Sequence, residues 1–204
     1  MACYVVLAPE PIRGICDTWP LCEQTVSGVS GAVYRKVADL GTAEALLRGE
    51  GRKLDPGTYA FIDGNAAGGI GVVLVHRKAD GSTVTREIST TVAEKWPPLA
   101  RDVERFRNPL VELLAAQAAF DAVHPGTTLT VVHDYEGTSA WIEGRWRLKD
   151  GVIGVQVIGC RATIHNRGLH VRFQHQPGHQ SDVGGDEYAA YNAKADALAT
   201  QAVA

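Results

Sequence analysis

The chain has 204 residues, a formal net charge of −3 and 45% hydrophobic residues, as expected for a globular protein with one ordinary domain and a small additional module. No apolar run approaches the ~20 residues of a membrane-spanning helix, and no basic region precedes the short apolar run at the N-terminus. The acidic balance argues weakly against a polyanionic partner. The four cysteines lack the spacing of a zinc site or a CxxC pair. We therefore expect a reduced, cytoplasmic protein without a signal peptide or a membrane partner.

Residues 1–48 predict a small α/β domain. Apolar, β-branched runs at 4–7 and 32–37 are typical of strands. Thr18 and Thr42 each precede a helical pattern, and each is predicted to be the N-cap of that helix. A unit of this size has a thin core, so we expect it to serve recognition rather than catalysis.

A larger domain is predicted over residues 58–204, after the polar stretch GEGRKLDPG at 49–57, which has the composition of a linker. Three strand patterns open this domain: residues 59–62, 70–76 and 83–89. Asp80–Gly81 between the last two is a strong hairpin-turn signal. The glycines that follow the first strand lack the sequence of a phosphate-binding loop, so we expect them to serve turns and close backbone approach.

Helical and strand patterns alternate in the rest of the chain. Residues 108–123, NPLVELLAAQAAFDAV, form the clearest helix, and Asn108 is its predicted N-cap. The further patterns are a buried strand at 129–132, an ambiguous strand or helix at 151–164, a strand at 169–174 and an alanine-rich helix at 188–203. This order indicates an α/β fold with a mixed sheet flanked by helices.

Four carboxylates stand out: Asp63 ends the first strand, Glu112 lies in the clear helix, Asp134 ends the buried strand, and Asp196 lies in the last helix. Taken alone, Asp134 is more commonly a helix cap, and Glu112 is equally compatible with a first-turn position and a ligand role. Neighbouring first and fourth strands would bring Asp63 and Asp134 together. Carboxylates a few ångströms apart share protons or bind metal, and hard oxygen ligands favour Mg²⁺ or Mn²⁺.

The motifs that contain these carboxylates are FIDGNA, RNPLVELLAA, VVHDYEG and YNAKADALA. In this order they resemble type 1 ribonuclease H of the kind that carries an N-terminal hybrid-binding (viroplasmin-like) domain. The resemblance implies a mixed five-stranded sheet and an endonuclease that hydrolyses the RNA strand of RNA/DNA hybrids, leaving 5′-phosphate and 3′-hydroxyl ends. It also implies two Mg²⁺ ions, replaceable by Mn²⁺, held by Asp63, Glu112, Asp134 and Asp196.

The same resemblance assigns further residues to the site. PGHQS is similar to the mobile glycine–histidine loop of the family, which implies that His179 lies beside the metals and assists proton transfer or product release. Asn108 matches a position that reads RNA 2′-hydroxyls, the group by which a protein distinguishes RNA from DNA. Asn65, in FIDGNA, is also expected to contact the substrate.

The N-terminal domain resembles the hybrid-binding domain over residues 4–47, in the motifs YVVL, TWPLC and GAVYRKV. The resemblance implies substrate binding by Tyr4, Trp19, Tyr34, Arg35 and Lys36. Trp19 and Tyr34 would pack against the sugars and phosphate of the DNA strand, and the two basic residues would contact phosphates and RNA hydroxyls. A core role in a small domain is the alternative for both aromatic residues. Double-stranded RNA is a second expected partner of this domain.

The sequence departs from the family pattern in two places, and two other functions are compatible with it. Ala193 stands where many members have Glu, so one outer carboxylate is absent unless Asp186 or Glu187 substitutes for it. The stretch after Trp146 lacks the basic helical protrusion of some members. The rivals are a nuclease of the same superfold that acts on DNA, such as a resolvase or integrase, and a hybrid-binding protein without catalysis. We expect a monomer.

Overall fold

A computed structural model describes residues 2–176 and 184–204. The described residues pack as two units, one formed by residues 2–54 with 184–190 and the other by residues 55–176 with 191–204. The predicted linker at 49–57 stays a prediction. Among the described residues, no helix is long and apolar enough to cross a membrane.

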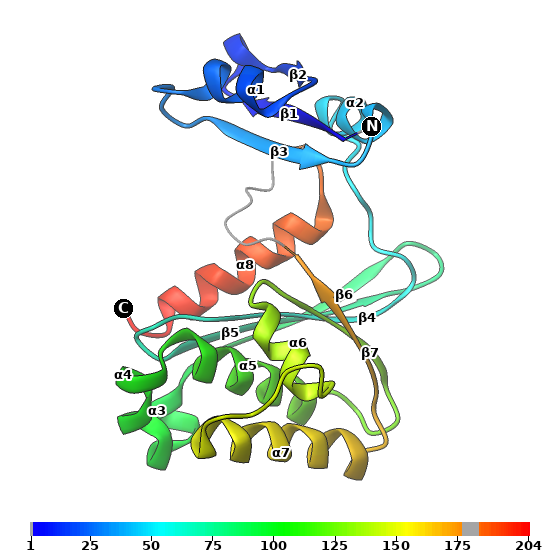
Figure 1. The fold of residues 1–204 in the computed structure, drawn as a ribbon. Coiled ribbons are helices and arrows are strands. Elements are labelled where there is room, and N and C mark those ends of the chain that lie inside the picture. The colour runs from blue at the N-terminus through cyan, green and yellow to red at the C-terminus, as the bar shows by residue number, and fades with distance from the viewer. Residues whose placement is uncertain (1, 177–183) are drawn as a thin grey trace. The chain divides into compact units, whose positions relative to one another are not determined.

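The first unit contains a three-stranded antiparallel sheet in the order β2-β1-β3 and two helices (Figure 1). Its elements are β1 (Cys3–Ala8), a 3-10 helix (Glu10–Ile12), β2 (Gly14–Cys16), α1 (Trp19–Val26), β3 (Val33–Val37) and α2 (Leu40–Leu47). Residues of β1 alternate between two small cores, as the period of a strand requires. Val5 packs with Leu46 of α2, whereas Val6 packs with Cys22 of α1.

Two details of this unit differ from the prediction. Strand β2 was not predicted, because three residues are too few to show an alternating pattern. Asp39, not Thr42, is the N-cap of α2, and its carboxylate accepts a hydrogen bond from the Thr42 backbone N–H at 2.9 Å. Both residue types cap helices, so only the position of the first turn decides between them.

The second unit has a mixed five-stranded sheet in the order β6-β5-β4-β7-β8 (Figure 1). The strands are β4 (Gly57–Gly64), β5 (Gly69–Arg77), β6 (Thr83–Thr91), β7 (Thr128–His133) and β8 (His170–His175). Strand β4 pairs antiparallel with β5 and parallel with β7, and β7 pairs parallel with β8. The predicted mixed sheet and the predicted neighbourhood of its first and fourth strands are confirmed.

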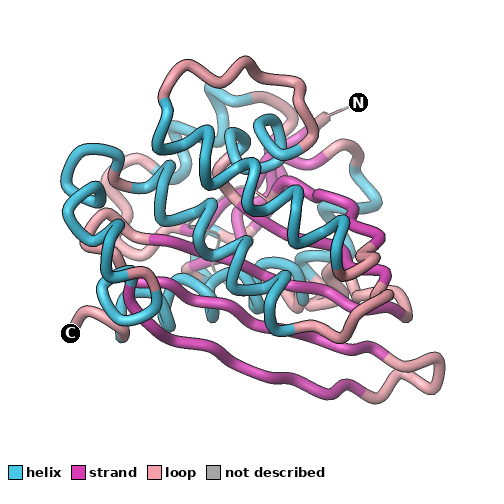
Figure 2. Tube along the Cα trace, turned by 90° about the horizontal axis from the view of Figure 1, so that it is seen from below, coloured by secondary structure: helices cyan, strands magenta, loops and turns pink. Residues whose placement is uncertain are grey.

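Helices cover both faces of this sheet (Figures 1 and 2). They are α3 (Val92–Lys95), a 3-10 helix (Pro97–Asp102), α4 (Val103–Phe106), α5 (Asn108–Ala122), α6 (Glu136–Ile142), α7 (Gly151–Asn166) and α8 (Glu187–Gln201). Ala60 and Ile62 of β4 belong to the core shared with α5 and α7. Phe61 points to the other face, where its ring lies 5.2 Å from that of Tyr191 in α8.

The structure resolves the ambiguous pattern at 151–164 as helix α7. Ile153, Val157 and Cys160 are its buried residues, at the spacing of one helical face. Asp150 caps the helix by accepting a hydrogen bond from the Val152 backbone N–H at 2.8 Å. The many β-branched residues made a strand equally plausible, because they favour strands by propensity.

Asn108 is the first residue of α5, not its N-cap. The N-cap is Arg107, with a φ of 49°. Pro109 lies in the first turn, where its missing N–H costs no helical hydrogen bond. The helical turns between residues 92 and 106 were not predicted, because they are too short for a clear period.

Gly71 in β5 allows α8 to pack directly on the sheet. A Cβ at this position would lie 1.9 Å from the carbonyl oxygen of Ala195, and backbone atoms of α8 cannot move aside cheaply. We expect Gly71→Ala to lower the free energy of unfolding by about 1–3 kcal/mol, as for overpacked cores. Chemical denaturation measures this change.

Gly154→Ala is the matched control, because nothing lies within 4 Å of a Cβ at this position in α7. Replacing a helical glycine by alanine is expected to stabilise the protein by roughly 0.5–1 kcal/mol. Equal effects of the two substitutions would contradict the packing of α8 against Gly71.

Candidate metal centre and nucleic-acid surface

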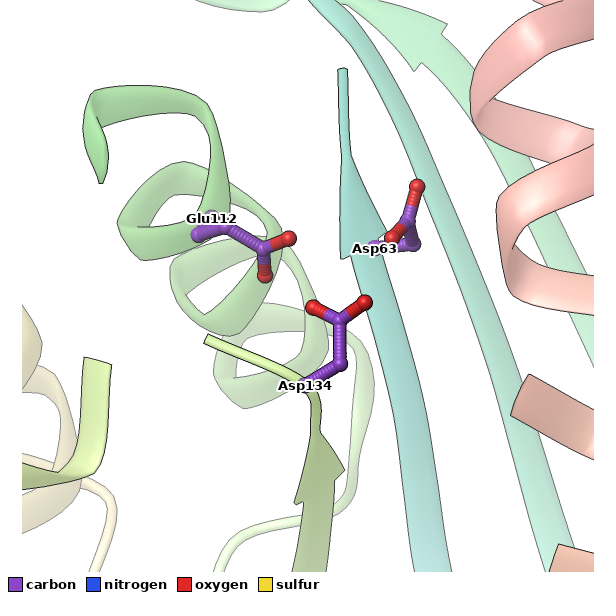
Figure 3. Close-up of side chains that lie close together, drawn as sticks. All are labelled: Asp63, Glu112 and Asp134. Atoms are coloured by element: carbon purple, nitrogen blue, oxygen red, sulfur yellow. The ribbon is translucent and has the colours of Figure 1, made fainter. Parts of the chain in front are cut away.

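Asp63, Glu112 and Asp134 meet at one edge of the five-stranded sheet (Figure 3). One ligand atom from each lies within 4.8 Å of the others. Asp63 is the second-last residue of β4, and Asp134 directly follows β7, the parallel neighbour of β4. Glu112 is in the second turn of α5. Because β4 and β7 run parallel, their carboxyl ends share this edge, the place where open α/β sheets bind ligands.

Glu112 has the most perturbed environment of the three. Its side chain is buried, and Oε1 accepts a hydrogen bond from the Gly64 backbone N–H at 3.2 Å. Burial, followed by the nearby charges of Asp63 and Asp134, raises the pKa of Glu112 well above its ordinary value. The hydrogen bond from Gly64 opposes this shift but does not outweigh it. Three clustered carboxylates therefore cannot all be ionised without a compensating positive charge.

The buried Glu112 Oε2 has no hydrogen-bond partner among the described residues. A buried carboxylate oxygen without a partner costs free energy, and a cation would remove that cost. The three side chains offer only oxygen ligands, which suit a hard divalent cation better than zinc. The residues present therefore fit a divalent metal ion.

Asp196 is not a member of this cluster. The segment of α8 that carries Asp196 nevertheless packs against Gly71, close to the cluster. The carbonyl oxygen of Ala195 lies against Gly71, and Gly71 is the antiparallel partner of Asp63. The predicted role of Asp196 as a fourth metal ligand stays a prediction.

Two histidines lie next to Asp134. His175, the last residue of β8, has its Nε2 2.9 Å from the carbonyl oxygen of Asp134. His133 is buried, and this burial lowers its pKa to about 4, so it is neutral at physiological pH. The sequence did not single out His175, although a strand end beside β7 was a usable signal. His179 lies outside the described residues.

The two asparagines expected to contact substrate differ in their surroundings. Asn65 is occupied by hydrogen bonds within the protein: its amide donates to Ala199 O at 2.8 Å, and its Oδ1 accepts from the backbone N–H groups of Ala67 and Gly69, each at 3.0 Å. This bonding favours a structural role in the β4–β5 turn. Asn108 is exposed at the start of α5, one turn before Glu112.

In the first unit, Tyr4, Trp19, Tyr34 and Lys36 form one surface group, here called the aromatic surface. The ring of Trp19 lies 5.5 Å from each of the two tyrosine rings, and the Lys36 ammonium lies 5.9 Å from the Tyr4 ring. The register explains the group, because Tyr4 is opposite Lys36 and Val6 is opposite Tyr34 in the β1–β3 pair. Trp19 and Tyr34 are 37% and 42% exposed, which does not suit a core role.

Arg35 faces the other side of β3 from the aromatic surface. It is 5% exposed, and its guanidinium forms an ion pair of 2.7 Å with Asp186. Alternation along a strand necessarily separates Arg35 from Tyr34 and Lys36. This environment does not favour the predicted contact of Arg35 with phosphates. Because Asp186 is paired with Arg35, it is not suited to replace the outer carboxylate that Ala193 lacks.

Comparisons with known proteins agree with this arrangement. Residues 3–47 match the family model of the ribonuclease H1 N-terminal domain. The solved structure of LC11 ribonuclease H1, isolated from compost by a metagenomic approach, is 19% identical and has a TM-score of 0.52; the match covers 73% of this chain and 96% of that chain. The larger unit has the ribonuclease H1 fold. The predicted resemblance is thus confirmed for the N-terminal domain and for the fold.

Two further solved structures are similar to the chain at lower TM-scores. Ribonuclease H1 from Halobacterium salinarum NRC-1 is 21% identical, with a TM-score of 0.47 over 71% of this chain and 96% of that one. LC11 ribonuclease H1 in complex with an RNA/DNA hybrid is 19% identical, with a TM-score of 0.49 over 72% and 96%. A search of the curated proteins gave no match. In the ribonuclease H1 fold found here, the three carboxylates remain the candidate active centre.

Proposed function

We propose that this protein is an endonuclease that hydrolyses the RNA strand of RNA/DNA hybrids and leaves 5′-phosphate and 3′-hydroxyl ends. The observation that carries the proposal is the cluster of the buried Asp63 and Glu112 with the half-buried Asp134 at the sheet edge of a ribonuclease H1 fold. Fold alone does not establish function, so the proposal rests on this site. A separate domain of the ribonuclease H1 N-terminal family supports a hybrid as the substrate.

The three carboxylates would hold divalent cations, with Asp196 as the proposed fourth ligand. Bound Mg²⁺, or Mn²⁺ in its place, would activate a water and stabilise the leaving oxygen. Asp63 would hold the ions together with the other carboxylates, since its antiparallel partner Gly71 packs against α8, the helix that carries Asp196. The exposed Asn108 beside Glu112 would contact an RNA 2′-hydroxyl, the group absent from DNA.

In the N-terminal domain, the aromatic surface would bind the hybrid. Exposed aromatic rings pack against sugars and bases without sequence preference, and a nearby ammonium attracts phosphate. The segment of residues 1–50 has more acidic than basic residues, so this local surface, not the overall charge, would supply the attraction. Double-stranded RNA is a second proposed partner.

Cleavage of labelled duplexes with Mg²⁺ tests the proposed function. The panel contains an RNA/DNA hybrid, double-stranded DNA and double-stranded RNA of one sequence, and the ends of the products are identified. RNA-strand cleavage confined to the hybrid is the expected result. Cleavage of DNA would favour a related nuclease, and tight hybrid binding without cleavage would favour a binding protein.

Trp19→Ala is expected to weaken binding of the hybrid by roughly tenfold or more, because an aromatic stacking contact is worth about 1–3 kcal/mol. The dissociation constant, measured by fluorescence anisotropy in EDTA, isolates binding from cleavage. Leu21→Ala is the control, since Leu21 is 48% exposed on the same helix but outside the aromatic surface. Equal affinities of the Trp19 variant and the native chain would show that this surface does not bind the hybrid.

A further inference from the structure

A buried ion pair joins strand β3 to the start of helix α8 within the first unit. Arg35 of β3 and Asp186, just before α8, are 2.7 Å apart, and their side chains are 4% and 3% exposed. The two residues are 151 positions apart in the sequence. Removing one member of a buried pair leaves an uncompensated charge, so this contact strongly constrains the residues that carry it.

Asp186 also organises the start of α8. Its Oδ2 accepts hydrogen bonds from Arg52 Nε and Nη2 at 3.1 and 2.9 Å. Its Oδ1 accepts hydrogen bonds from the backbone N–H groups of Tyr188 and Ala189 at 3.0 and 3.3 Å, which is the bonding of an N-cap. One carboxylate therefore joins two guanidinium groups to the first turn of the helix.

Backbone contacts hold the same segment on residues 51–54. The Gly51 N–H donates to Gly184 O at 2.8 Å, and the Glu187 N–H donates to Arg52 O at 2.9 Å. In return, Glu187 Oε2 accepts from the Leu54 N–H at 2.9 Å. A Cβ at Gly51 would lie 2.5 Å from Asp186 N, so the segments are in close contact. Glu187 is thus committed here, as is Asp186.

We propose that Arg35 is a positioning residue that acts through Asp186 on Asp196. Helix α8 starts at this ion pair and continues into the second unit, where Asp196 lies ten residues further, or about 15 Å along the helix axis. Arg35 fixes the first turn of α8, and the continuous helix fixes the orientation of the Asp196 carboxylate. This inference rests on the proposed function of Asp196.

The test compares Arg35→Gln with the native full-length chain by two measurements. Hydrogen exchange is expected to show lost protection at the amides of Tyr188 and Ala189. Steady-state cleavage of the hybrid is expected to show kcat reduced by about 10- to 100-fold with little change in KM, because a small misplacement of a catalytic group has an effect of this size. The Mn²⁺ concentration that gives half-maximal activity is expected to rise. Arg35→Lys is expected to restore part of kcat.

Matched variants separate positioning from other causes. Arg48→Gln removes an exposed arginine of the same unit and is expected to leave exchange, kcat and KM unchanged. Asp186→Asn keeps a capping residue but loses the charge, so it should reproduce Arg35→Gln, and the double variant should be no worse than either single variant. Where Arg35→Gln is too unstable to assay, Asp186→Asn alone gives the same exchange and kcat test.

The outcomes distinguish this inference from the proposed function. A higher KM with unchanged kcat would mean that Arg35 contacts the nucleic acid, and unchanged exchange in α8 would mean that the pair does not hold the helix. Either result overturns the positioning role. Absence of cleavage by the native chain would overturn the proposed function instead, and the exchange measurement would still decide whether Arg35 holds α8.

Discussion

Asp134→Asn is expected to reduce cleavage of an RNA/DNA hybrid by roughly 10²–10⁴-fold, because charge stabilisation by metal ions is worth several kcal/mol. The substitution keeps the size of the side chain and removes a negative charge from the cluster with Asp63 and Glu112. The measurement is the single-turnover rate on a labelled hybrid with saturating Mg²⁺. Binding of the hybrid in EDTA should be retained, since the aromatic surface is unchanged.

Asp80→Asn is the control for this prediction. Asp80 is exposed in the β5–β6 turn, where its Oδ1 accepts a hydrogen bond from the Ser82 backbone N–H. Asparagine can form the same turn, so folding and cleavage should match those of the native chain. Equal cleavage by Asp134→Asn and the native chain would mean that the active centre lies elsewhere.

Glu112→Gln is expected to abolish cleavage and, without divalent cations, to stabilise the protein. The native side chain is buried beside Asp63 and Asp134, and glutamine removes the charge while it keeps the shape. A gain of about 1–3 kcal/mol is typical of removing a poorly compensated buried charge, and would raise Tm by roughly 3–10 °C in a protein of this size. Thermal unfolding in EDTA at pH 8 measures the change.

The stabilising effect should depend on pH in a defined direction. The folded-state pKa of Glu112 is raised, so above its ordinary value of 4.5 the folded state holds a proton that the unfolded state has released. The free energy of unfolding therefore falls as the pH rises through the window between the ordinary and the raised pKa. Below that window the penalty is absent. The Tm difference between Glu112→Gln and the native chain should accordingly be small near pH 4 and grow toward pH 8.

Divalent cations should reverse the order of the Tm values of the native chain and Glu112→Gln. At pH 8, Mg²⁺ is expected to raise the Tm of the native chain, since a ligand that binds only the folded state stabilises it. The rise should be smaller in Glu112→Gln, which has lost a ligand. A native Tm that does not respond to Mg²⁺ or Mn²⁺ would contradict a metal centre at this cluster.

Several parts of the molecule were predictable because they depend on local patterns. Alternating and continuous apolar runs gave the strands of the sheet, and the position of Asp134 after one of them placed it at a strand end. Glu112 could be assigned to a helix because the pattern from residue 108 is long and periodic. The aromatic surface was predicted from the resemblance of short motifs, not from any period.

Other parts depended on contacts between distant segments. Arg35 and Lys36 have the same chemistry and adjacent positions, yet one is buried on Asp186 and the other is exposed beside Tyr4. Which of the two is buried depends on the register of β3 and on the packing of residue 186 in the first unit. Asn65 was predicted only as a substrate contact, because its hydrogen bond with Ala199 joins segments far apart in the sequence.

The sequence by itself determined the order of the longer strands and helices, apart from the ambiguous segment 151–164, and the local position of each carboxylate, because these follow from side-chain periodicity and from turn and cap residues. The tertiary structure decided which carboxylates meet. It placed Asp63, Glu112 and Asp134 together through the parallel pairing of β4 with β7 and the packing of α5, and left Asp196 outside that cluster. Such pairings depend on packing between segments far apart in the chain, which no local pattern records.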